Sequence, residues 1–409
     1  MITGDGPAST IGVSRWPTPF PFLAWPWLYL AILALGTICL IAGGTVKTWR
    51  VPHLRGLATP LAVLIGAFLL SAAASQVHTL SATAFLAVIA IVAAGWIFAL
   101  LVEDEAVRRG IWPVIAVAVL LLAVRVILWR RDEGLNVVAF LVLNNAWAGK
   151  LQLAWVLNLF APLLLARAMG ESHRGLAVLY GVTWTLAGVA TYLLFSRMGT
   201  IVFAVTTVGV WIFNPGQWRR VVLIMILSAA IGGVLAARSD RMARYVVSTI
   251  LEPDRNPGVG LRLGVWSDAL LLFRSRPITG TGLGTFDEIS YRLEHHTGDP
   301  LFRQNGWHAH NVYLHLLAET GIPGLLAWCY LWYAIIVRLL SAWKHGDAQH
   351  RLYLSGALWA VLAFLVLSIS EVLIGARVHA SLRMNLTIAL IVVLGLHVAA
   401  EIDRRRSLH

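Results

Sequence analysis

The feature that most constrains this chain is the recurrence of apolar runs of roughly 20 residues, each long enough to cross a bilayer as a helix. Only 13% of the residues are charged, whereas soluble domains carry about 25%. The sequence therefore predicts an all-α polytopic integral membrane protein with about 11–12 transmembrane helices. The visible runs lie near residues 22–44, 57–75, 79–102, 111–130, 150–169, 175–194, 198–214, 219–237, 320–341, 352–374 and 382–401. A twelfth could lie in the proline-rich start or in 134–147.

Lysine and arginine gather in every second loop between these runs, which the positive-inside rule assigns to the cytoplasm. The net charge of +12 is first a signal of this topology, and no nucleic-acid partner is expected. The alternate loops then face outward, and the longest of them defines three expected regions. These are N-terminal transmembrane helices (1–237), one large periplasmic loop (238–319), and C-terminal transmembrane helices with a basic cytoplasmic tail (320–409).

Within the large loop, residues 261–286 predict an amphipathic helix followed by a glycine-rich turn, because Pro277 and Gly280 end the helical pattern. The spacing of the turn's glycines does not fit a dinucleotide-binding fingerprint. We expect the apolar side chains of this helix on or in the membrane surface, with its arginines toward phosphates. The apolar positions are Leu263, Val265, Trp266, Leu270 and Phe273, and the basic ones are Arg262, Arg274 and Arg276.

Two further arginines stand inside or beside apolar spans. Arg197 separates two spans with almost no loop around it, and Arg125 lies within a span near its outward end. A charge at such a depth is costly unless it faces a polar cavity or an anion. For these side chains and for Arg262, two interpretations stay open. They extend to the headgroups, or they bind a phosphate-rich substrate through the planar guanidinium fork.

The stretch WHAHN places two histidines, His308 and His310, at the entrance of an apolar run. An imidazole titrates near neutral pH, so either ring is a candidate general base, with Asn311 beside it to orient a ring or hold a hydroxyl. A buried core histidine is the plainer alternative. A zinc-type arrangement such as HExxH is missing, and we expect neither metal nor cofactor. Glu319 reads as a helix-end charge or as a polar wall of the cavity.

These segments together resemble the O-antigen ligase and polymerase superfamily. The resemblance rests on SRMG after a span, on R-x3-W-x6-F followed by PITGTGLGTF, and on HAHN. Ligases of this superfamily carry His-(Asn/Ser/Gln), nine residues, Gly, two residues and Gly, which His310 through Gly324 match. By motif the resemblance covers roughly 190–330, and the rest of the chain resembles the family only in helix number and length.

The resemblance implies a glycosyltransferase of lipopolysaccharide maturation, multi-pass in the bacterial inner membrane, with its active site on the periplasmic face. The implied donor is a glycan on undecaprenyl pyrophosphate, and the implied acceptor is a hydroxyl of lipid A–core. His310 would be the catalytic base of a metal-independent, inverting transfer, and Arg197 and Arg262 would bind the pyrophosphate. The candidate substrate-binding residues are His308 and Asn311, with Arg125, Arg274 and Arg276 proposed for acceptor phosphates from charge alone.

Three other functions stay open at this point. An O-antigen polymerase or a protein O-oligosaccharyltransferase would use the same donor with another acceptor. A flippase or other transporter of lipid-linked oligosaccharides would also be polytopic and basic. A transporter is typically built from repeats with broken helices near the bilayer midplane, and the sequence indicates neither.

Overall fold

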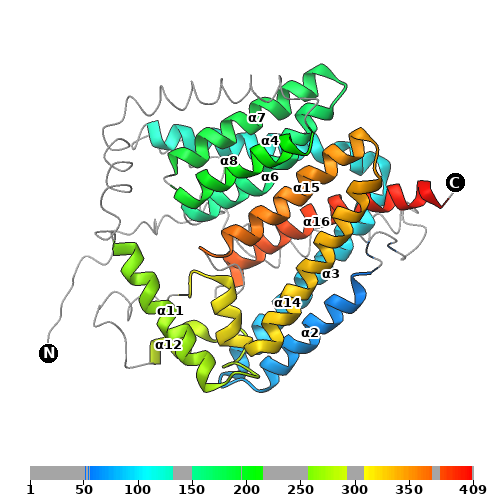
Figure 1. Cartoon of the computed structure of the whole chain (residues 1–409). Coiled ribbons are helices and arrows are strands. Elements are labelled where there is room, and N and C mark those ends of the chain that lie inside the picture. Colours follow the sequence, from blue (N-terminus) through cyan, green and yellow to red (C-terminus); the bar gives the residue numbers. More distant parts are fainter. Residues whose placement is uncertain are drawn as a thin grey trace.

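The computed structural model describes residues 51–131 except 52, 53 and 55, residues 150–214 except 195, and residues 257–292, 308–370 and 378–407. Within these ranges every regular element is a helix, which confirms the predicted all-α polytopic membrane class (Figure 1). The elements are α2 (Ala58–Ala73), α3 (His78–Glu103), α4 (Glu105–Arg131), α6 (Lys150–Gly170), α7 (Arg174–Leu193), α8 (Arg197–Ile212), α11 (Pro257–Ser275), α12 (Phe286–Arg292), α14 (Val312–His345), α15 (Ala348–Leu367) and α16 (Val378–Arg406).

Among the described residues, 7 helices are long and apolar enough to cross a membrane, and α2 and α8 are shorter apolar helices. The spans expected at 22–44 and 219–237, and the apolar stretch 134–147, lie outside the described residues. The span expected at 320–341 begins earlier, at Val312. Gly321 has φ 65° and ψ −166° inside α14, so the motif residues form a short helical segment before a kink, and the longer helix follows it.

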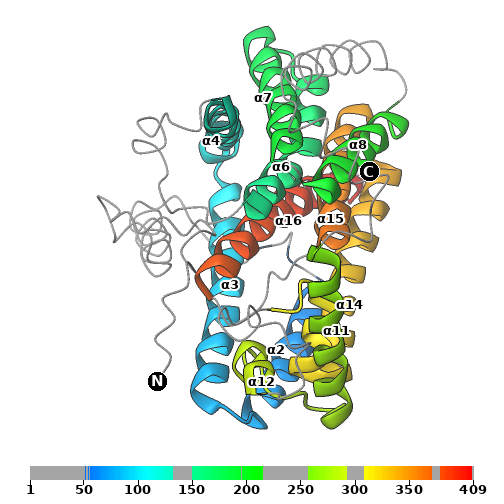
Figure 2. The same ribbon diagram turned by 90° about the vertical axis from the view of Figure 1, so that its left-hand side faces the viewer.

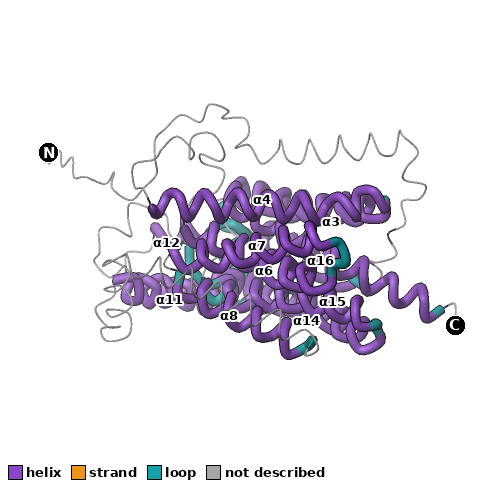
Figure 3. The backbone as a smooth tube through the Cα atoms, turned by 90° about the horizontal axis from the view of Figure 1, so that it is seen from above, coloured by secondary structure: helices purple, strands orange, loops and turns teal. Residues whose placement is uncertain are grey.

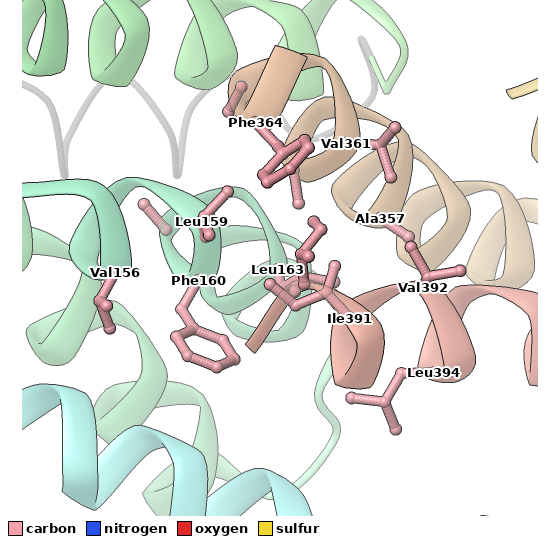
Figure 4. Close-up of a cluster of buried hydrophobic side chains, with 14 of the residues drawn as sticks. Val156, Leu159, Phe160, Leu163, Ala357, Val361, Phe364, Ile391, Val392 and Leu394 are labelled. Carbon is pink, nitrogen blue, oxygen red and sulfur yellow. The ribbon is translucent and has the colours of Figure 1, made fainter. Parts of the chain in front are cut away.

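Helix α6 lies at the centre of the bundle, packed against α7, α8 and α15. Its side chains meet those of α15 and α16 in a cluster that includes Leu159, Leu163 and Phe364 (Figure 4). A helix that is apolar on all sides is expected to be buried on all sides. A small residue allows close approach here, because a Cβ on Gly356 would come within 2.9 Å of the Ala166 side chain.

The helix ends that the positive-inside rule assigns to the cytoplasm meet at one end of the bundle, which we call the inner end. Ion pairs between partly exposed side chains join them. The pairs are Arg404–Glu103, Arg338–Asp403 and Arg405–Asp347, with nitrogen–oxygen distances of 3.8, 3.5 and 3.8 Å. The basic loops that the sequence groups on one side are therefore together in space.

Helices α11 and α12 lie at the opposite end, which we call the outer end (Figures 2 and 3). There α11 packs against the beginning of α14, and α12 connects to both. Arg276, directly after α11, donates a hydrogen bond from Nη1 to the carbonyl oxygen of Ala74 at 3.1 Å. That carbonyl follows the last turn of α2, where backbone acceptors lack helical partners. The outer end thus joins α2, α11 and α14.

Candidate functional site

One face of α11 packs against the segment that precedes α14. Val265, Ala269 and Leu272 are buried in a small apolar cluster with Phe286 and Ile289 of α12 and with Ala309 and Ala318. The Trp266 indole N–H donates a hydrogen bond to the carbonyl oxygen of Ala309 at 2.9 Å. Helix α11 therefore holds the backbone between the two candidate histidines.

This packing corrects part of the expectation for α11. Val265 and Trp266 face protein rather than the membrane surface. Leu263 and Leu270 remain 58% and 39% exposed, in keeping with a surface position. The amphipathic pattern identified the apolar positions, but a pattern of spacing does not distinguish a neighbouring helix from a lipid surface, since both accept the same side chains.

The histidine loop, residues 308–311, has an unusual backbone. His310 has φ 47°, and among the described residues it is the single non-glycine position with positive φ. The His308 and His310 rings lie in a tilted contact, with centroids 4.3 Å apart and an interplanar angle of 43°. Both side chains are half-buried, so they remain accessible to a substrate.

Asn311 begins α14 as its N-cap. Its side-chain oxygen accepts a hydrogen bond from the Leu314 N–H at 3.1 Å, which satisfies one of the free donors at the helix start. The Val312 N–H donates to the carbonyl oxygen of Ser368, just beyond α15, at 2.8 Å. Asn311 is therefore committed through its oxygen to the fold, and its amide nitrogen is the atom left to meet a substrate.

Arg197 is the first residue of α8, after the N-cap Ser196, whose hydroxyl oxygen accepts the Gly199 N–H at 3.2 Å. The hydroxyl and the close glycine explain why SRMG begins a helix. The other end of α8 lies beside the first half of α15, because Asn214 donates to the Ser355 hydroxyl at 2.9 Å. The two helices thus run antiparallel, and the start of α8 lies at the outer end.

Arg262 lies four residues before Trp266 on α11, and so on the same helix face, about 6 Å along the axis. Arg262 is thus on the face of α11 that contacts the histidine loop through Trp266, and the start of α8 lies at the same end of the bundle. The remaining basic candidates are arranged differently. Arg125 belongs to α4, whose main neighbour is α7, Arg274 is exposed in the last turn of α11, and Arg276 bonds Ala74.

The glycine turn, residues 277–285, confirms the turn expected after α11, and it is bound to α14 by a carboxylate. The fully buried Glu319 accepts hydrogen bonds from the N–H groups of Gly284 at 2.8 Å and Phe286 at 2.9 Å. Its backbone oxygen accepts from the Gly282 N–H at 3.0 Å and from the Ser71 hydroxyl at 2.7 Å. Sequence reasoning assigned Glu319 a plainer role, because the partners lie more than 30 positions away.

Two glycines let the turn and α14 touch. A Cβ on Gly280, at φ 64°, would overlap the backbone of Glu319 and Thr320. A Cβ on Gly321, at φ 65°, would come within 2.5 Å of the Ile278 carbonyl oxygen. Positive φ and the lack of space both require glycine at these positions. The first glycine of the motif therefore serves the packing of the motif against the turn.

An apolar cavity of about 190 Å³ lies between α2, α3, α14 and α16. Its outer limit is formed by Leu283 and Gly284 of the glycine turn. Along α3 its lining runs from Ala84 to Trp96, a distance of about 18 Å at the rise of an α-helix. The cavity is thus a long apolar space that begins directly under the turn. In the part of the chain that the structure describes, no group of three His, Cys, Asp or Glu residues is arranged to hold a metal ion.

Comparison with known proteins adds two similarities. Residues 182–329 match the sequence model of a family described as O-antigen ligase, and this range contains the start of α8, α11, the glycine turn and the histidine loop. A Haemophilus influenzae protein described as uncharacterized is 23% identical over 162 residues, which span 37% of this chain and 41% of that protein.

Proposed function

We propose that this chain, which belongs to the O-antigen ligase superfamily, is an O-antigen ligase. The superfamily makes it a glycan-transferring enzyme of the ligase or polymerase type. The proposal adds the donor, a glycan on undecaprenyl pyrophosphate, and the acceptor, a hydroxyl of lipid A–core at the periplasmic face of the inner membrane. The observation that carries it is the close His308–His310 ring pair, held by α11 through Trp266, which lies one helical turn from Arg262.

The residues of the outer end fit a single displacement. His310 takes the proton of the acceptor hydroxyl, and the oxygen attacks the anomeric carbon of the donor sugar. The bond from that carbon to the pyrophosphate oxygen breaks, and the sugar configuration inverts. The leaving pyrophosphate is already a weak base, so a proton donor is not required. Arg197 and Arg262 stabilise its growing charge through guanidinium contacts, and such fixed contacts are worth most in a site that excludes water.

The apolar cavity supports a lipid-linked donor. A polyprenyl chain must stay in the hydrocarbon layer while its pyrophosphate reaches the outer end. The cavity begins at Leu283 and Gly284 and continues between α2, α3, α14 and α16, almost without polar lining. A chain placed there would bury apolar surface at about 25 cal/mol per Å². The position of the cavity relative to the histidine loop therefore suits a substrate with a charged head and a long apolar tail.

The test is reconstitution of the purified protein in liposomes with lipid-linked glycan and rough lipopolysaccharide. We expect glycan on lipid A–core. Lengthening of the lipid-linked glycan instead would indicate a polymerase, and glycan on a supplied protein acceptor would indicate an oligosaccharyltransferase. Movement of the intact donor across the bilayer without any new glycosidic bond would refute enzymatic transfer and support a transporter.

A further inference from the structure

Among the described residues of the outer end, Glu319 is a fully buried carboxylate that the proposed chemistry does not use. We propose that Glu319 is a positioning residue for glycan transfer, which fixes the glycine turn to the start of α14 and thereby holds His310 in place. The proposal rests on the proposed function in taking His310 as the base. It adds a residue that never touches the substrate.

The environment of Glu319 is built for a carboxylate. Its side chain is 0% exposed and accepts two backbone hydrogen bonds, from Gly284 and Phe286. A buried carboxylate is costly without such donors, and bonds to a charged acceptor are about twice as strong as neutral ones. Because both donors belong to one short backbone stretch, the carboxylate sets the distance and the orientation of the turn relative to α14.

His315 completes this arrangement. It lies one helical turn before Glu319, with its Nε2 atom 3.2 Å from the Glu319 Oε1 atom, and its ring packs against Phe286 with centroids 5.0 Å apart. His315 is also 0% exposed. A side chain without access to solvent cannot take a proton from an acceptor hydroxyl, so His315 is a neighbour of the carboxylate rather than an alternative base.

A continuous set of contacts leads from Glu319 to the catalytic candidate. The carboxylate accepts a hydrogen bond from the N–H of Phe286, the first residue of α12. The Phe286 side chain packs with Val265 and Ala269 of α11. Trp266, the residue after Val265, donates a hydrogen bond to the carbonyl oxygen of Ala309, the residue directly before His310. A shift of the glycine turn would therefore move α12 and α11 together with the loop that carries the imidazole.

The most informative substitution is Glu319→Gln, which keeps the volume and removes half of the acceptors. The glutamine oxygen can accept one of the two N–H groups, but its NH₂ group faces the other as a second donor. The turn then loses one attachment without leaving a cavity. Glu401→Gln is the matched control, because it removes a partly exposed carboxylate at the inner end that pairs with Arg405.

The expected result is a fall in kcat of about 10- to 100-fold for Glu319→Gln, because small misplacements of catalytic groups have effects of this size. Hydrogen–deuterium exchange should rise in peptides covering both 280–290 and 308–314. Unchanged kcat in the folded variant, or faster exchange confined to 280–290, would overturn the proposal. The control should match the wild type in both measurements.

Ser71→Ala is a milder second variant, should Glu319→Gln fail to fold. It removes only the hydroxyl that donates to the Glu319 carbonyl oxygen. We expect a smaller rise in exchange in the same two peptides, and unchanged exchange in 308–314 would overturn the proposal. Exchange is measured without substrate, so it tests the positioning role even if the wild-type protein fails to modify lipid A–core. That failure would count against the proposed function alone.

Discussion

The two ends of the helix bundle hold their charges in opposite ways. At the inner end, partly exposed arginines and carboxylates pair across helices, with nitrogen–oxygen distances of 3.5–3.8 Å. At the outer end, a fully buried carboxylate accepts hydrogen bonds from backbone N–H groups. Exposed pairs typically contribute about 0–1 kcal/mol and weaken with salt, whereas removal of one partner from a buried charged bond costs several times more.

This difference indicates different tasks. The inner pairs connect helix ends whose membrane orientation is already determined by the basic loops. The loss of any one pair should therefore lower the stability only slightly. In the proposed function, the outer end must hold a half-buried imidazole and a guanidinium at fixed separation, which requires preorganised geometry. We therefore expect substitutions at the outer end to affect turnover strongly and those at the inner end to affect stability weakly.

The largest expected effect is that of His310→Ala, which should lower turnover by about 10²–10⁴-fold, the usual contribution of a general base. His345→Ala supplies the comparison, because His345 lies at the inner end of the same helix α14. The His345→Ala variant should turn over donor at the wild-type rate. The measurement is initial rate of glycan transfer in liposomes at equal amounts of folded protein. Near-normal transfer by His310→Ala would move the role of base to His308.

The next effect concerns the arginine side chains. Arg197→Lys and Arg262→Lys should each lose about 10²-fold in kcat/KM, because lysine keeps the charge but lacks the planar fork. Arg274→Lys, on α11 but exposed, should be nearly silent. Donor turnover is measured for all three variants in the same lipid. Full activity of Arg197→Lys or Arg262→Lys would indicate that the arginine in question contacts lipid headgroups rather than the pyrophosphate.

The two arginines also permit a test of joint action. If both bind one pyrophosphate, the double lysine variant should be little worse than the single variants, because loss of either misplaces the same group. Strict additivity of the two free-energy changes would instead indicate two independent contacts.

A moderate effect is expected in the apolar cavity. Ala87 lines it and is 8% exposed, whereas the neighbouring Leu86 is 59% exposed on the outside of α3. Ala87→Phe should raise the KM for a long-chain donor about tenfold, equivalent to about 1.4 kcal/mol, with little change for a short-chain analogue. Leu86→Phe should change neither KM. If Ala87→Phe changed the KM for long-chain and short-chain donors equally, the cavity would not be the binding site of the donor's apolar chain.

The smallest effect belongs to the inner end. Asp347 caps α15, and the His350 N–H that donates to its carboxylate lowers the pKa of that group below the ordinary value of 3.8. A lowered folded-state pKa stabilises the protein above about pH 4, and this contribution disappears as the pH falls through the lowered value. Asp347→Ala should cost about 1 kcal/mol near neutral pH. Thermal melting at pH 7 and pH 3 tests this, since the difference from wild type should shrink at the lower pH.

Much of the fold could be predicted because the bilayer requires long apolar helices, and these are visible as runs in the sequence. The runs at 79–102 and 352–374, for example, correspond to α3 and α15 within a few residues at most ends. The start of α14 was harder to place. Its first turns contain the polar residues His315 and Glu319, so hydropathy alone placed the start of the span at 320, although the helix already begins after the Asn311 cap.

The candidate site was predictable only as a set of local patterns. The resemblance to the ligase family identified His310, Asn311 and Gly321 as one motif, and the local glycine pattern identified Gly280 as part of a turn. The contact between that turn and the motif depends on Glu319 reaching Gly284 and Phe286, and a single sequence carries no signal that pairs such distant positions. For the same reason, the apolar face of α11 did not reveal that α14 is its neighbour.

The φ of 47° at His310 has a consequence for how this loop can vary. In the left-handed region a side chain costs roughly 1–2 kcal/mol relative to glycine. A glycine at position 310 would therefore remove the backbone strain of the loop, but it would also remove the imidazole. The histidine keeps its place at the expense of local stability. Selection for thermal robustness alone would be expected to remove this imidazole early, so stabilising the enzyme and preserving its turnover are opposing demands at this position.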